Sequence, residues 1–186
     1  ALIFVNGIGC VINHWHHQVQ YFSSQYRCIT YDLRGHYKSS LKESTSELSM
    51  NALAKDLAAL MDYLKIEKAH LAGHSFGVQI LAEFADQFPE KLGSLILVNG
   101  FVKNPILNMF GQANGVEKVF HFIRTQYEKS PVLWTSVWKS LVNNPLSIIF
   151  TAAAGGFNIR RTHLKDIEVY LSGVSQMELG VFLPLF

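Results

Sequence analysis

The chain has 186 residues, of which 49% are hydrophobic and 16% charged, and its formal net charge is +2. This composition supports a sizeable core and excludes wholesale disorder. The sequence has no basic stripe, so nothing in it indicates a nucleic-acid partner. The longest nearly uncharged apolar stretch, residues 146–157, is too short to span a membrane, which takes about 20 apolar residues.

The first hundred residues alternate predicted strands and helices. We expect strands at residues 2–5, 27–31, 68–72 and 95–98, and helices at 14–21, 50–64 and 76–88. The helix after Ser49 is the clearest, because apolar residues recur every three or four positions and Ser49 can cap its amino end. This alternation predicts the α/β class, with a parallel sheet, right-handed crossovers and helices on both faces.

From residue 103 onward the alternation stops. Apolar stripes at helical spacing predict helices around residues 116–123, 133–141 and 164–171, separated by Asn-Pro and Gly-Gly breaks. We therefore expect residues 103–186 to form an all-helical insertion after the fourth strand. Four ring-bearing side chains are expected to lie in the core or to line a pocket: Trp15, His121, Trp134 and Trp138.

The pentapeptide Gly73-His-Ser75-Phe-Gly77 stands between a predicted strand and a predicted helix, which is the position of a nucleophile elbow. Side chains two residues before and after Ser75 would collide in so tight a turn, and glycine at both places relieves this. The helix that begins at Phe76 directs its positive end and an unsatisfied amide toward Ser75. The alternative is an ordinary turn in which Ser75 only caps the helix.

A glycine-rich loop, Asn6-Gly-Ile8-Gly9, follows the first predicted strand. An oxyanion hole needs two convergent N–H groups, and we expect the amides of Ile8 and Phe76 to supply them. The loop alone does not exclude a glycine-rich turn that binds no ligand.

The histidines offer no evident base for Ser75. His121 and His163 are the only histidines after it, and neither follows a predicted strand. His74 is expected to point away from its neighbour. His14 and His17 share a helical face, but no carboxylate or cysteine completes a ligand set, so no metal site is expected.

Taken in order, NGIG, Trp15, YDLRGH, GHSFG and LILVNG resemble the α/β-hydrolase superfamily over about residues 1–100. The resemblance implies that residues 1–102 hold the third to sixth strands of an eight-stranded core, and that residues 103–186 are a helical cap. It also implies that Ser75 is the nucleophile and that the amides of Ile8 and Phe76 form the oxyanion hole. Tyr37 stands where the family's loop motif has a second glycine, and Asp32 and Arg34 would be structural.

In this family the acid and the histidine of the triad come after the serine, on loops behind the last two strands. Both ends of the sequence are apolar, so we expect an internal portion of a longer protein, with the acid and the histidine beyond Phe186.

These features predict a cofactor-free serine hydrolase that cleaves a small-molecule ester or related acyl compound with a hydrophobic part, through an acyl-enzyme. Thioesterase, amidase, carbon–carbon hydrolase and haloperoxidase activities stay open. So do a non-catalytic ligand-binding protein of the same fold and a cap that associates with membrane surfaces or proteins. The sequence indicates no oligomeric state. With only Cys10 and Cys28, we expect reduced thiols and a cytoplasmic location.

Overall fold

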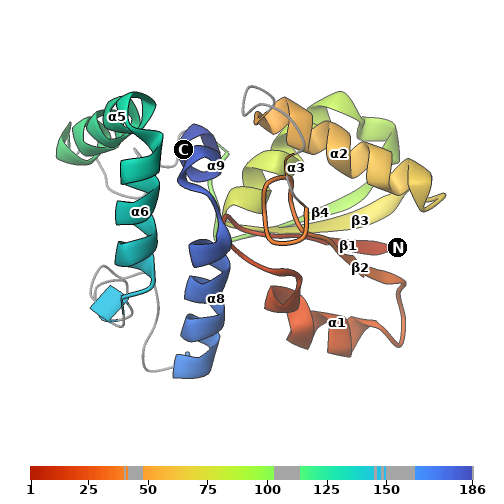
Figure 1. The fold of residues 1–186 in the computed structure, drawn as a ribbon. Helices are drawn as coiled ribbons and strands as arrows, with labels where there is room; N and C mark the ends of the chain where they lie inside the picture. Colours follow the sequence, from red (N-terminus) through yellow and green to blue (C-terminus); the bar gives the residue numbers. More distant parts are fainter. Residues whose placement is uncertain are drawn as a thin grey trace.

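The computed structural model describes residues 1–39, 41, 48–102, 114–144, 146–147, 149 and 162–185. A parallel sheet organises the first half of the chain, in the order β2-β1-β3-β4 (Figure 1). Its strands are β1 (Leu2–Val5), β2 (Cys28–Thr30), β3 (Ala69–His74) and β4 (Leu92–Val98). The chain runs outward from β1 to β2 and then returns across β1 to form β3. The direction of winding therefore changes between β1 and β3, whose ends pair at Val5 and Gly73.

Helices cover both faces of the sheet, which confirms the predicted α/β class. On one face lie α2 (Met50–Tyr63) and α3 (Phe76–Gln87), and on the other lies α1 (His16–Phe22), which follows the short 3-10 helix η1 (Ile12–Trp15) (Figure 1). A second 3-10 turn, η3 (Pro89–Lys91), joins α3 to β4.

All four residues of β1 are buried, because alternate side chains of a strand enter opposite faces and both faces are covered. Ile3 and Val5 belong to the larger core cluster, beneath α2 and α3. Phe4 packs instead on Trp15, with ring centroids 5.0 Å apart. Trp15 is thus a core residue, as the sequence predicts.

Ser49 caps α2 as expected. Its backbone is extended and its hydroxyl accepts a hydrogen bond from the amide of Ala52, 3.1 Å away. The cap satisfies one of the amides that a helix start leaves without a partner.

Replacing Ser49 by alanine is expected to lower the free energy of unfolding by about 1 kcal/mol, the usual cost of a lost N-cap. Chemical denaturation would measure the change. The exposed Ser24, mutated to alanine, is the control, and an equal loss in both variants would contradict the capping role.

The loop after β2 is fixed to α2 by an ion pair. Arg34 donates from Nε to Oδ2 of Asp56 at 2.8 Å and from Nη2 to Oδ1 at 2.6 Å. Tyr37 has φ = 42° and so adopts the left-handed conformation that glycine favours. The loop therefore turns without a second glycine, and Arg34 has the structural contact that the sequence analysis assigns to it.

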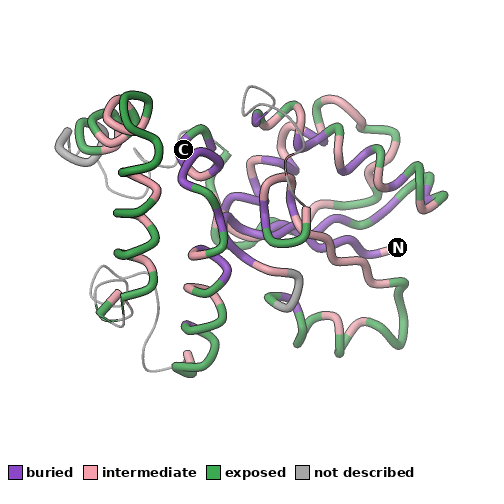
Figure 2. The backbone as a smooth tube through the Cα atoms, in the orientation of Figure 1, coloured by how far each residue is buried: buried purple, intermediate pink, exposed green. Residues whose placement is uncertain are grey.

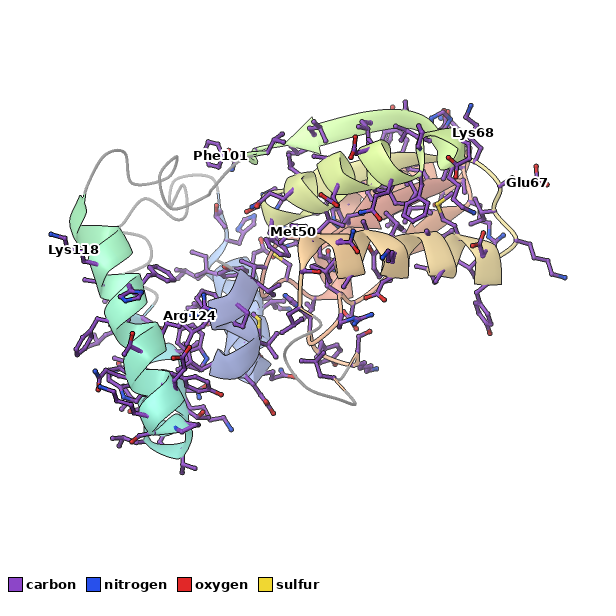
Figure 3. All side chains as sticks on the ribbon, turned by 90° about the horizontal axis from the view of Figure 1, so that it is seen from above. Met50, Glu67, Lys68, Phe101, Lys118 and Arg124 are labelled. Carbon is purple, nitrogen blue, oxygen red and sulfur yellow. The ribbon has the colours of Figure 1, made fainter. Side chains whose placement is uncertain are left out.

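The second half of the described chain is helical. Its elements are α5 (Asn114–Lys129), α6 (Pro131–Val142), α8 (Leu164–Gln176), α9 (Leu179–Phe182) and the 3-10 turn η4 (Leu183–Leu185). Figure 1 shows α8 and α9 between the sheet and the pair α5 and α6. The view from above also shows that α5 is separate from α2: Lys118 and Arg124 of α5 lie well apart from Met50 at the start of α2 (Figure 3).

The two parts of this region differ in burial. Most residues of α5 and α6 are exposed, whereas α9 and η4 are largely buried (Figure 2). Met177, Val181 and Leu185 join the larger core cluster of the sheet and its helices. The sequence analysis does not anticipate α9 and η4.

The backbone of α8 lies directly against the glycine-rich loop after β1. A Cβ atom on Gly173 would collide with the carbonyl oxygen of Gly9, and one on Gly9 would come within 2.5 Å of Val174 Cγ2. Gly9 has φ = 70°, so a side chain there would be strained as well. Within the described residues, no helix is long and apolar enough to cross a membrane.

Candidate active site

Ser75 stands on a strained turn between β3 and α3. Its backbone has φ = 52° and ψ = −115°, a conformation that L-residues rarely adopt and that usually marks a functional position. Its amide donates to the carbonyl of Val98 at 3.0 Å, which ties the turn to the end of β4. Its side chain makes no capping hydrogen bond to α3, so helix capping does not explain the residue.

The two flanking glycines are sterically required. A Cβ atom on Gly73 would lie 2.8 Å from the carbonyl oxygen of Gly77, on the other side of the turn. A Cβ atom on Gly77 would lie 2.5 Å from the carbonyl oxygen of Val5, at the end of β1. The physical reason that the sequence analysis gives for both glycines therefore holds in the fold.

The glycine-rich loop after β1 lies beside the turn. A Cβ atom on Gly7 would be 3.3 Å from the Cβ atom of Ser75, so the two backbones are near contact. Phe76 is the first residue of α3, and the side chains of Ile8 and Phe76 are both buried. The structure thus brings together the two segments that carry the expected oxyanion-hole amides. That these amides converge on one oxygen stays a prediction.

Both segments leave the carboxyl ends of neighbouring strands at the place where the winding of the sheet reverses. In open α/β sheets, ligands bind in the crevice outside the strand ends at such a switch point. Ser75 follows β3 and the glycine-rich loop follows β1, the two strands on either side of this point. The topology therefore supports the same site independently of the motif.

No histidine among the described residues forms a hydrogen bond with Ser75. His121 and His163 are exposed on the helical region, and the expectation that His121 lies in the core or lines a pocket is wrong. Its neighbour Phe120 lines an apolar cavity with Trp134 and Trp138, and His121 is rotated about 100° from it around α5. The expectation for the two tryptophans is met.

His74 faces the loop after β1. Its ring lies edge-on to Trp15, with centroids 6.3 Å apart, and 5.2 Å from the ring of His14. Its Nδ1 atom is buried and has no hydrogen-bond partner. Burial, followed by the nearby His14, lowers the pKa of His74, so the ring is neutral near pH 7.

Cys10 joins these two histidines. Ligand atoms of Cys10, His14 and His74 all lie within 4.8 Å of one another. The sequence analysis finds no cysteine to complete a set around His14, and the structure corrects this. His74 is sixty residues further along the chain, so no local spacing could reveal the cluster.

Comparison with known proteins agrees with the fold. The family model described as alpha/beta hydrolase fold matches residues 1–140, and the chain belongs to this family. The 3-oxoadipate enol-lactonase 2 of Acinetobacter baylyi is 36% identical over 103 residues, which are 55% of this chain and 38% of the lactonase. Epoxide hydrolase 1 of Caenorhabditis elegans is 27% identical over 139 residues, which are 73% of this chain and 34% of that protein.

Among solved structures, an epoxide hydrolase of Bacillus megaterium in complex with an inhibitor matches with a TM-score of 0.71 at 17% identity. The match covers 99% of this chain and 63% of that one. The chain therefore spans about a third of the two curated relatives, and less than two thirds of the solved structure.

Proposed function

We propose that the protein is a serine hydrolase that cleaves a carboxylic ester or related acyl compound through a covalent acyl-enzyme. The strained backbone of Ser75, at the switch point and without a capping role, is the observation that carries this proposal. A nucleophile held on such a turn projects its oxygen into the crevice above the sheet.

In the proposed reaction, Ser75 Oγ attacks the carbonyl carbon and its proton passes to a histidine base, which the described histidines do not supply. The amides of Ile8 and Phe76 donate hydrogen bonds to the oxyanion that forms. The alcohol leaves with the proton, and water then releases the acid from the acyl-enzyme. No step requires a metal or an organic cofactor.

One comparison supports the substrate class. The similar lactonase is named for an enol-lactone, which is a cyclic ester, and the serine at the elbow suits attack on such a carbonyl. Thioester, amide and carbon–carbon substrates fit the same chemistry.

A fluorophosphonate probe tests the nucleophile, since it phosphonylates only an activated serine. The full-length protein is expected to be labelled once, on the peptide that holds Ser75, and Ser75→Ala is expected to abolish labelling. Ser94→Ala is the control, because Ser94 Oγ lies 2.8 Å from His70 Nδ1, at the opposite end of the strands from Ser75. Label that survives in Ser75→Ala would refute the proposal. Folded protein that takes no label would favour a ligand-binding role. The lack of a hydrogen bond between Ser75 and any described histidine is consistent with that role.

A further inference from the structure

We infer that Cys10, His14 and His74 form a binding site for a thiolate-seeking transition-metal ion, zinc above all. One sulfur and two imidazole nitrogens converge from three parts of the fold: the loop after β1, the 3-10 helix η1 and the end of β3. Thiolate and imidazole are the ligands that zinc prefers, whereas magnesium and calcium require oxygen.

The distances between the three ligand atoms suit a zinc site. Tetrahedral zinc holds sulfur at about 2.3 Å and nitrogen at about 2.0 Å, so its ligand atoms lie about 3.5 Å apart. The three atoms here lie within 4.8 Å of one another, so a shift of about 1 Å closes the set. His14 is exposed and can make this shift, while Cys10 is 3% exposed and held in place.

A bound metal would account for one geometric feature of the cluster. The Nδ1 atom of His74 is buried without a hydrogen-bond partner, which is costly for a polar atom. A neutral imidazole ring offers a lone pair to a metal ion. Burial raises the pKa of the Cys10 thiol to about 12, so the metal must displace a proton, which passes to solvent.

A cavity of about 350 Å³ opens onto the cluster and gives an ion a path to it. Cys10, His14 and His74 line this cavity, and so does Asp166 of α8. The carboxylate of Asp166 is near enough to raise the pKa of His14, against the larger lowering by burial and by His16. One thiolate and one carboxylate would together neutralise a divalent ion, and Asp166 or a water molecule can take the fourth position.

The position of the site gives it a mechanical role. Cys10 lies two residues after Ile8, and His74 directly precedes Ser75. A bound ion would therefore clamp the glycine-rich loop to the turn that carries Ser75. The proposed reaction gives no role to Cys10, His14 or His74, so a failure of either proposal leaves the other standing.

Cobalt titration of the full-length, metal-free protein tests the site, with a phosphine reductant that keeps thiols reduced. We expect one equivalent to bind, with the visible bands of tetrahedral cobalt and a thiolate-to-cobalt charge-transfer band, both removed by zinc. Cys10→Ser is expected to abolish the charge-transfer band. Cys28→Ser, which alters the only other cysteine, is the matched control and should leave it unchanged.

His14→Gln provides a second measurement if Cys10→Ser fails to fold, because His14 is exposed. It is expected to weaken zinc binding more than about tenfold, since loss of outer-shell partners alone costs about 10–100-fold. His17→Gln, which alters another histidine of the same cavity, should bind zinc normally. The inference is overturned if wild-type protein binds no stoichiometric cobalt, or if the charge-transfer band follows Cys28.

Discussion

Replacement of Ser75 by glycine is expected to abolish hydrolysis while making the folded protein more stable. The proposed reaction would lose its nucleophile, so kcat/KM for a chromogenic aryl ester should fall at least about 10³-fold. The strain of φ = 52° disappears, because glycine adopts positive φ freely. Such strain costs about 1–3 kcal/mol, and the greater freedom of glycine in the unfolded chain offsets about 0.5–1 kcal/mol. The net gain should be about 1 kcal/mol in the free energy of unfolding.

Ser75→Ala separates the two effects. Alanine removes the hydroxyl but keeps the Cβ atom, so activity should be lost without the gain in stability. Denaturant titration of the three proteins gives the comparison. Equal stability of the glycine and alanine variants would mean that the backbone at this turn is not strained in solution.

Gly77→Ala is expected to destabilise the protein by about 3 kcal/mol, toward the upper end for an overpacked site. The added Cβ atom would meet the carbonyl oxygens of Val5 and Asn6 at 2.5 and 2.9 Å, and both belong to backbone at the end of β1. Backbone in a buried strand end cannot yield as a side chain can. Because the displaced carbonyls lead directly into the glycine-rich loop, ester hydrolysis should fall together with stability.

Gly180→Ala is the matched control for that variant. Its Cβ atom would also collide, but with the hydroxyl of Tyr127, at the far end of a side chain that can turn aside. We expect a much smaller change in the free energy of unfolding. Comparable losses in the two variants would show that the approach of α3 to β1 is not the cause.

Strong local signals made the α/β core predictable from the sequence. The continuous apolar run of β1 and the capped, periodic α2 both appear where expected. The prediction begins β4 at Leu95, whereas the strand begins at Leu92. Gly93 and Ser94 have weak strand propensity, but pairing with β3 and the contact of Ser94 with His70 extend the strand.

Elements decided by tertiary contacts could not be predicted. Helix α9 has only four residues, which is too short to show a helical repeat of apolar positions. It forms because Val181 enters a core built mostly from the first half of the chain. The nucleophile turn was predictable, since its glycines are local. The cluster of Cys10, His14 and His74 could not be predicted, because its members meet only when β3 lies beside β1.

The contact between Gly173 of α8 and Gly9 has a consequence for protein engineering. Residues 164–185 are built into the core and rest on the loop that carries one expected oxyanion donor, whereas α5 and α6 lie outside them. A chimaera that imports another relative's selectivity should therefore graft only α5 and α6. Its crossover points should fall before Asn114 and between Val142 and Leu164, so that the recipient keeps its own α8 and the matching pair of glycines.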